Sequence, residues 1–420
     1  MSVQNLQKEH TRRLPSDGDS FRMAQATVTS PQSTPTAGTF QTGQVLTIAG
    51  GHLTHDVFTS FLAPLLPLII QKLGLSLTLA GALAAFQQFP GLANPFLGLL
   101  ADRGSLYWLA ILAPTVTAVS MSLIGVAPGY TVLVILLLVA GVSTAVWHVP
   151  TPVTIARVSG GQVGQGMSFF MLGGELARSI GPLLAVGAVS WWGLEGIWRL
   201  IPLGVAASVV LYWRTREIGG ARPATHANGS WAETWRELSR VMWPVAGIIL
   251  ARGFMVAALT TFLPTFLASE GASLPQAGGA LSILELAGAA GVLTSGTLSD
   301  RLGRRRVLAF VLSVAPVLML VFLTMRGWST VPLLMAMGFI TLSTNPVLMA
   351  LVQEHGRDHP ATANGLYMAL SFAGQSLIIV LVGIMADHWG LRTAFHWCAL
   401  LGFAGVVFVL LLPKKTTGDR

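Results

Sequence analysis

The sequence predicts an all-α integral membrane protein with twelve transmembrane helices in two pseudo-symmetric six-helix bundles. Apolar residues make up 53% of the chain and charged residues only 10%, and the mean hydropathy is +0.67. A soluble domain carries roughly 25% charged residues, so the composition argues against a cytosolic enzyme. From Val45 onward, apolar stretches of roughly 20 residues, each long enough to cross a bilayer, follow one another almost without pause.

The predicted spans fall into two groups of six, separated by a polar linker. In chain order they cover residues 44–70, 77–101, 107–126, 131–155, 165–191, 197–214, 241–268, 276–298, 306–325, 331–354, 360–386 and 392–412. The resulting domains are a disordered tail at 1–43, a first bundle at 44–214, a linker at 215–240, a second bundle at 241–412 and a tail at 413–420. The first tail is rich in Ser, Thr, Gln and Pro, which do not bury enough apolar area to fold alone. Within the linker, residues 231–240 predict a short amphipathic helix that lies on the membrane surface.

The distribution of basic residues predicts the orientation of the chain. Nineteen Lys and Arg residues fall in segments on the side of the termini, and four fall on the other side, namely Lys72, Arg199, Arg326 and Arg392. Because cytoplasmic loops retain positive charge, we expect both termini in the cytoplasm and the protein in the inner cell membrane. The net charge of +8 therefore reflects topology, and we expect no nucleic-acid partner.

An internal repeat supports the division into two halves. The segment GLLADR at 98–103 follows the second predicted span, and GTLSDR at 296–301 follows the eighth. Two six-helix halves that meet around a cavity are typical of secondary transporters. The carboxylates can cap a neighbouring helix and the guanidiniums can bind helix ends, so these loops predict a gate. The alternative is a short turn with topology-setting charge. The predicted gating residues are Asp102, Arg103, Asp300 and Arg301.

The repeated Gly-x-x-x-Asp-Arg loops resemble the loop signature of the major facilitator superfamily. The chain further resembles its fosmidomycin-resistance branch in HLTHD at 52–56, WHVPTP at 147–152, GGELARSIGP at 173–182 and ADHWG at 386–390. This resemblance implies the major facilitator fold and proton-driven efflux of small polar drugs. It also has departures: the first loop continues as GSLY, and Leu137 stands where the superfamily has a helix 4 arginine. The absent arginine moves the expected proton route to the first helix.

Ionisable residues inside the apolar stretches carry most of the functional information, because each costs about 2.5 to 3.5 kcal/mol at the bilayer centre. Asp56 lies near the middle of the first span, and His52 lies four residues earlier on the same face. We interpret them as the proton-coupling pair, with Glu175 and Glu285 as the next candidates. The alternative is a satisfied polar pair that only fixes helix packing. His55 is expected to face away from Asp56 and to pack.

Other buried polar residues are candidates for substrate binding. Arg178 is three residues from Glu175, so the two can neutralise each other, whereas Arg252 has no local partner. Arginine suits forked contacts to carboxylate or phosphonate groups. His148 and Asn345 lie beside prolines at related places in the two halves, where they bend a helix, bind substrate or do both. The predicted substrate-binding residues are Arg252, Arg178, His148, Gln88, Asn345 and Gln375.

The remaining motifs narrow the energy source and the function. None of the four lysines lies in a Gly-rich loop, so no P-loop for ATP is predicted, and there is no HExxH pair. The single cysteine, Cys398, excludes a cysteine-based metal cluster, and we expect no metal and no cofactor. We therefore predict a monomeric secondary transporter, with protons, a small-molecule substrate and the lipid bilayer as partners. It exports a small polar or anionic compound in exchange for protons. The alternatives are a metabolite importer or uniporter, and a membrane sensor or enzyme on the same scaffold.

Overall fold

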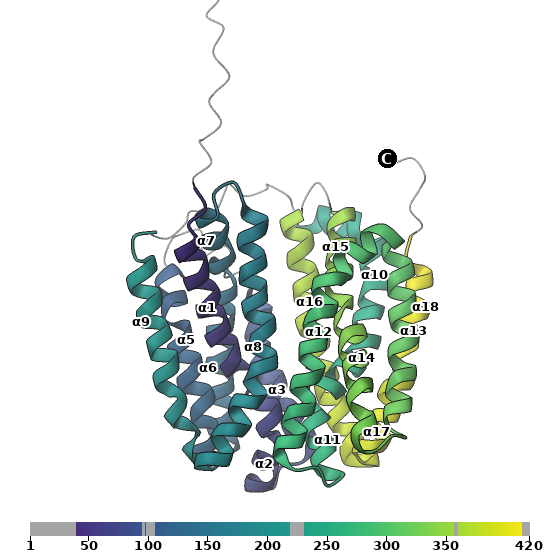
Figure 1. Ribbon diagram of the computed structural model, residues 1–420. Coiled ribbons are helices and arrows are strands. Elements are labelled where there is room, and N and C mark those ends of the chain that lie inside the picture. The colour runs from purple at the N-terminus through teal and green to yellow at the C-terminus, as the bar shows by residue number, and fades with distance from the viewer. Residues whose placement is uncertain (1–38, 95–96, 98–105, 219–230, 357–359, 414–420) are drawn as a thin grey trace, which may run out of the picture. The chain divides into compact units, whose positions relative to one another are not determined.

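The computed structural model describes residues 39–94, 97, 106–218, 231–356 and 360–413, and every element within them is a helix (Figure 1). Among these residues, eleven helices are long and apolar enough to cross a membrane. They confirm the predicted spans with one exception, residues 77–101, of which the structure describes the first part and only Leu97 beyond residue 94. The predicted tail at 1–43 falls mostly outside the described residues.

The first half of the chain forms one bundle, and several of its spans consist of two consecutive helical segments. Its elements are α1 (Thr42–Thr59), α2 (Leu62–Leu73), α3 (Leu77–Gln88), η1 (Phe89–Ala93), α5 (Leu106–Leu123), η2 (Ile124–Val126), α6 (Tyr130–His148), α7 (Pro150–Val158), α8 (Val163–Trp192), η3 (Leu194–Leu200) and α9 (Ile201–Thr215).

The second half repeats this plan. Its elements are α10 (Trp231–Val256), the π-helical η4 (Ala257–Phe262), α11 (Leu263–Ser269), α12 (Leu274–Leu302), α13 (Arg304–Phe322), η5 (Gly327–Ser329), α14 (Thr330–Leu342), α15 (Thr344–His355), α16 (Pro360–Trp389), α17 (Leu391–Gly402) and α18 (Ala404–Leu411). Residues 231–240, predicted to form a short amphipathic helix, are helical and continue into the span as the start of α10. Good helix formers such as Ala, Glu, Leu and Arg continue there without a break into the apolar span.

Prolines interrupt the fourth and tenth spans at related places. α6 ends at His148, directly before Val149 and Pro150. α14 ends at Leu342, and α15 then carries Pro346 in its first turn. Proline lacks the N–H that would continue the hydrogen-bond ladder, so each span divides into two helices. His148 and Asn345 therefore lie beside the two breaks.

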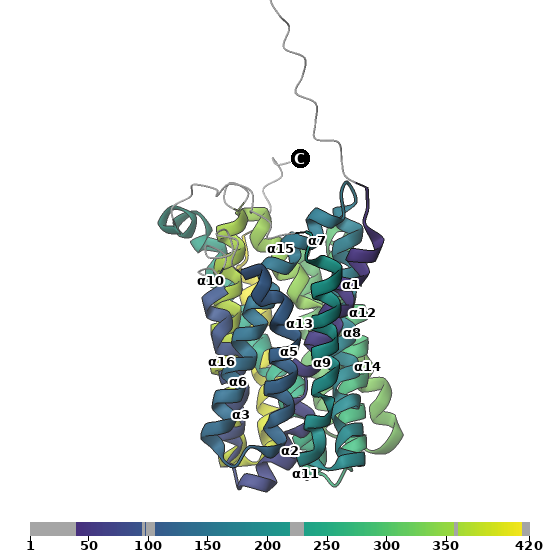
Figure 2. The same cartoon turned by 90° about the vertical axis from the view of Figure 1, so that its left-hand side faces the viewer.

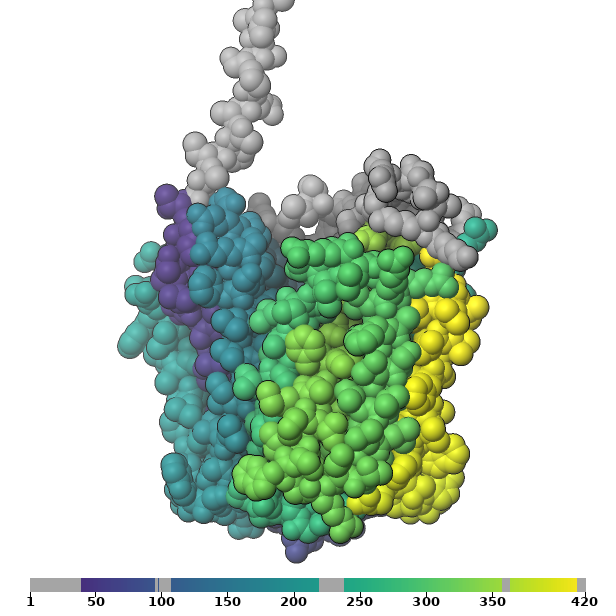
Figure 3. All heavy atoms as spheres, turned by 45° about the vertical axis from the view of Figure 1, so that its right-hand side comes forward, coloured from purple at the N-terminus to yellow at the C-terminus, as the bar shows by residue number. Residues whose placement is uncertain are grey.

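The two halves share a core at one end and have separate cores at the other. The largest apolar cluster contains residues of both halves, for example Phe58, Leu83, Phe262 and Phe395. Nearer the linker, one cluster holds only first-half residues and another holds only second-half residues. Figures 1 and 2 place α7 and α15 at the end of the molecule where α1 begins and α18 ends, with α2 and α11 at the opposite end. The halves are thus joined most closely at the end opposite the linker, and Figure 3 shows them as adjoining bodies.

A carboxylate fastens the halves together at this joined end. Asp387, near the end of α16, accepts hydrogen bonds from the backbone N–H groups of Leu77 and Thr78 at 2.7 and 2.8 Å, and from the Thr78 hydroxyl at 2.6 Å. A carboxylate at a helix N-terminus is favourable because the free N–H groups there carry partial positive charge. Gly383 allows the close contact, since a Cβ there would lie 2.5 Å from the carbonyl oxygen of Leu77.

Candidate functional site

Asp56 lies near the end of α1 with three imidazoles around its carboxylate. The Nε2 atoms of His52 and His148 lie 3.1 and 3.7 Å from Asp56 Oδ2, and His55 Nδ1 lies 2.7 Å from Asp56 Oδ1. The predicted proximity of His52 and Asp56 is confirmed. The expectation that His55 faces away from Asp56 is wrong, because adjacent side chains on a helix still meet when both bend toward the same space. The structure brings His148, which was predicted to bind substrate, to Asp56 from another helix.

Backbone carbonyls fix the orientation of two of these imidazoles. His52 Nδ1 lies 2.7 Å from the Phe170 carbonyl oxygen, and His148 Nδ1 lies 3.0 Å from the Thr144 carbonyl oxygen. A carbonyl only accepts, so each Nδ1 carries the proton and donates it. In addition, the His52 ring stacks on Phe170, with centroids 4.0 Å apart. Both rings are therefore held with Nε2 toward Asp56.

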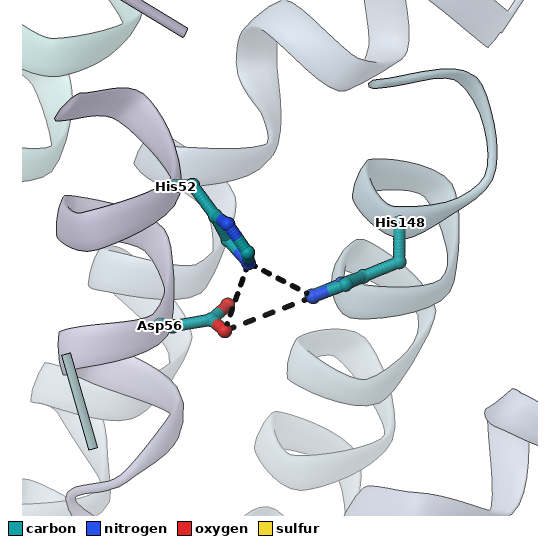
Figure 4. Close-up of side chains that lie close together, drawn as sticks. All are labelled: His52, Asp56 and His148. Carbon is teal, nitrogen blue, oxygen red and sulfur yellow. Dashed lines mark hydrogen bonds and ion pairs between the residues drawn. The ribbon is translucent and has the colours of Figure 1, made fainter. Parts of the chain in front are cut away.

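This arrangement places three acceptor atoms face to face, as Figure 4 shows. The two Nε2 atoms are 3.2 Å apart, and each lies near Asp56 Oδ2. If both imidazoles are neutral, every one of these atoms presents a lone pair to the others. The cluster of His52, Asp56 and His148, which we call the acceptor triangle, therefore requires a cation. One proton on an Nε2 atom satisfies it, and the three atoms also lie close enough together to hold a metal ion.

Two glycines of α8 let this helix approach α1 at the triangle. A Cβ on Gly173 would lie 2.5 Å from the Ala49 carbonyl oxygen, and a Cβ on Gly174 would lie 2.6 Å from His52 Cε1. Gly174 also borders Asp56, because its Cβ would lie 3.3 Å from Oδ2. These two glycines, which begin the GGELARSIGP segment at 173–182, thus form one wall of the triangle.

One turn further along α8, an ion-paired group links the two halves. Glu175 and Glu285 are both buried, and Arg178 of α8 pairs with Glu175 on its own helix, as predicted. It also lies 3.5 Å from Glu285 Oε2, measured from Nε, so it reaches α12 in the other half. Because this pair crosses between the two halves, the spacing of residues within one span could not predict it. Arg178, predicted to bind substrate, is occupied by two carboxylates.

Arg252 of α10 has a different environment. Its guanidinium is buried and donates from Nη1 to the Thr344 hydroxyl, while Nε is buried without a hydrogen-bond partner among the described residues. Tyr367 is its electrostatic neighbour, and the Tyr367 hydroxyl lies 3.4 Å from Asn345 Oδ1. Among the described residues, no carboxylate forms an ion pair with Arg252. This region of the second half therefore contains a buried cation, Arg252, with the hydroxyl groups of Thr344 and Tyr367 nearby and the amide of Asn345 beyond them.

The other predicted site residues are less tightly engaged. Gln88 and Gln375 are half-buried, and it is the neighbouring Gln87 that donates to the Thr59 carbonyl. Asp300 is paired at 2.5 Å with Arg304, which also contacts Glu354 at 3.0 Å, whereas Arg301 is exposed. Asp102 and Arg103 lie outside the described residues.

Comparison with known proteins identifies the class. Residues 48–379 match the family model of the Major Facilitator Superfamily, and the chain belongs to this superfamily of transporters. It is 25% identical to the fosmidomycin resistance protein of Escherichia coli over 88% of this chain and 92% of that protein. It is also 25% identical to a probable sulfoacetate transporter of Cupriavidus necator, over 83% of this chain and 89% of that protein.

Solved structures show the same fold. A bacterial homologue of the human lysosomal transporter Spinster, in an inward-facing and unoccupied conformation, superposes with a TM-score of 0.72 at 15% identity, covering 89% of this chain and 95% of that one. A D-xylose-proton symporter superposes with a TM-score of 0.71 at 15% identity, covering 91% of this chain and all of that one. The protein is thus a multi-pass membrane transporter of the major facilitator fold.

Proposed function

We propose that this transporter exports a small polar or anionic organic compound in exchange for protons, by alternating access across the inner cell membrane with both termini in the cytoplasm. The observation that carries the proposal is the acceptor triangle, whose atoms His52 Nε2, Asp56 Oδ2 and His148 Nε2 need a cation between them. The proton gradient across a cell membrane can supply this cation, and imidazole nitrogens bind a proton readily.

The proton would change the contacts between helices. When His148 Nε2 carries it, the N–H donates to Asp56 Oδ2 and draws α1 and α6 together. When it leaves, the lone pairs that face each other favour separation. A ligand that binds two arrangements unequally shifts the balance between them. Proton binding is thereby coupled to the position of α1, which also packs along α8 through Gly173 and Gly174.

The substrate is proposed to bind in the second half, at Arg252, with Asn345, Gln375 and the first-half residue Gln88 as further polar contacts. Arg252 has no carboxylate partner among the described residues, so an anionic group on the substrate would supply one. The relative described as a probable sulfoacetate transporter supports this class, because sulfoacetate carries two acidic groups. Arg178, Glu175 and Glu285 connect the halves and transmit the change, and the carboxylates are the next proton candidates.

Uphill transport in proteoliposomes tests this function. Candidate anions are first screened by their effect on the thermal stability of the purified protein. A stabilising compound is then loaded at equal concentration on both sides, and a pH gradient is imposed. We expect the compound to accumulate on the more acidic side while protons leave that side, as exchange requires. Equal flux with and without the gradient would support a uniporter, and co-movement of protons and compound would support an importer; either result would overturn the proposal.

A further inference from the structure

The acceptor triangle has the dimensions of a metal site. Its sides are 3.1 Å between His52 Nε2 and Asp56 Oδ2, 3.2 Å between the two Nε2 atoms, and 3.7 Å between His148 Nε2 and Asp56 Oδ2. Zinc bonds of roughly 2.0 to 2.1 Å in tetrahedral geometry separate neighbouring ligand atoms by about 3.3 to 3.4 Å. An ion above this triangle would therefore reach all three atoms with only small movements of the side chains (Figure 4).

The surroundings of the triangle also match those of a metal site. A histidine that binds a metal usually donates its other ring N–H to a carbonyl or carboxylate, which fixes the tautomer. Here the Nδ1 atoms of His52 and His148 both donate to backbone carbonyls. The second oxygen of Asp56 accepts from His55, so the carboxylate is oriented as well. Each of the three ligand atoms is thus presented by a group that is already held in place.

The ligand set selects the class of ion. Two imidazoles and one carboxylate suit zinc, cobalt, nickel and related divalent ions, whereas magnesium and calcium prefer oxygen ligands. Three protein ligands leave a fourth position open. The side chain of His148 is 35% exposed, so this position can be reached by water or a small ligand. Glu175 and Glu285 would not join the site, because both are engaged with Arg178.

We infer that His52, Asp56 and His148 form a binding site for a divalent transition-metal ion of the zinc class, with one open coordination position. The ion occupies the place of the proton, so it blocks proton exchange and arrests transport. The binding itself is independent of the proposed function; the arrest of transport rests on it. This site was not predicted from the sequence, because its ligands come from two different spans.

Metal binding to the purified protein tests the inference. Tag-free protein is treated with a chelator and titrated with ZnCl2 by calorimetry and with CoCl2 by visible absorption. We expect one saturable site per chain and the absorption bands of tetrahedral cobalt. His148→Ala should weaken binding by about ten-fold or more, since loss of a supporting partner alone weakens a site by roughly 10- to 100-fold. The matched control is His355→Ala, because the one hydrogen bond of His355 within the described part of the chain is to the carbonyl of Leu351 in its own helix. This variant should bind zinc normally.

Several outcomes separate the inference from the proposed function. Absence of saturable binding, or equal binding by His148→Ala and the native protein, would overturn the metal site and leave proton exchange standing. A variant that fails to fold is recognised by its thermal unfolding without metal, and Asp56→Asn, which keeps the side-chain size, then takes its place. In proteoliposomes, zinc should inhibit the native protein and His355→Ala alike. If a chelator abolishes transport instead, the result supports the metal site. It would contradict the proposal that the triangle carries a proton during transport.

Discussion

The two halves of the molecule differ in the groups that surround a buried charge. In the first half, the Asp56 carboxylate is surrounded by three imidazoles, which accept or release positive charge. In the second half, the guanidinium of Arg252 is permanently charged, and within the described part of the chain it contacts a hydroxyl group rather than a carboxylate. Keeping these two charges apart suits one half to an exchangeable cation and the other to an anionic ligand.

The Arg178 group is where the two environments meet. Arg178 pairs with Glu175 in the first half and with Glu285 in the second, and Asp56 also attracts it electrostatically. Two buried carboxylates share one guanidinium, so this group carries a net negative charge when all three residues are ionised. Removing one member of a buried ion pair leaves its partner uncompensated, which is strongly unfavourable. The contact between α8 and α12 is therefore sensitive to charge in either half.

The largest effect is expected at Asp56, which we propose to hold the exchanged cation in the first half. Asp56→Asn keeps the shape of the side chain but removes the charge, so the acceptor triangle no longer holds a proton. We expect uphill efflux under an imposed pH gradient to fall to the level of empty liposomes, while substrate binding survives. Glu195→Gln serves as a control, because Glu195 is an exposed carboxylate paired with Lys72. Continued pumping by Asp56→Asn would move the proton site to Glu175 or Glu285.

Arg252→Lys tests the second half while keeping the charge. Lysine lacks the planar fork that binds carboxylate or phosphonate groups at two points. Hydrogen bonds to charged groups contribute about 1.5 to 3 kcal/mol, so loss of one should weaken substrate binding by about 10- to 100-fold. Arg178→Lys is the matched comparison. The guanidinium of Arg178 is already paired with two carboxylates, so this substitution should reduce substrate affinity less. Equal loss in both variants, measured by ligand-dependent thermal stability, would contradict separate tasks for the two arginines.

Much of the fold was predictable from the sequence because crossing a bilayer imposes long apolar stretches, and these set the spans within a few residues. Pairs within one helix were predictable too, since His52 and Asp56, and Glu175 and Arg178, follow the helical repeat. Contacts between spans were not. The approach of His148 to Asp56 and of Glu285 to Arg178 depends on which faces of two helices meet, and hydropathy carries no information about that. The metal-compatible triangle was missed for the same reason.

The joint between the halves gives a third prediction. Asp387→Asn removes the charge that holds the N-terminus of α3 against α16. We expect the molecule to spend more time open at the end opposite the linker, with cysteines introduced there labelled several-fold faster. Glu270→Gln is the matched control, because Glu270 lies at the same end but pairs with Arg392 inside the second half. If both variants label at the native rate, Asp387 is only a local helix cap.

A smaller effect is expected at the linker end of the second half. Asp300→Asn removes the pair with Arg304, which remains bound to Glu354. Transport should slow without loss of insertion, and labelling from the linker side should change, as predicted for a gate. Glu354→Gln is the comparison, because it also removes a negative charge beside Arg304 but leaves the Asp300–Arg304 pair intact. A slower rate in Asp300→Asn alone would show a specific role for Asp300. Normal transport and labelling in Asp300→Asn would reduce the repeated loop to a topology signal.

The smallest effect concerns stability, at a charge pair that lies apart from both sites. Hydrogen bonding from Arg392 lowers the pKa of Glu270 below its ordinary value of 4.5. A lowered pKa in the folded protein stabilises it above the ordinary value, and this contribution is lost as the pH falls through the folded pKa. The pair is largely solvated, so its contribution is modest and declines with added salt. In Glu270→Gln, the unfolding temperature should therefore lie slightly below the native one at pH 7, and the two should converge as the pH falls below 4.5. A difference that persists or grows in acid would mean that Glu270 acts through packing rather than through its charge.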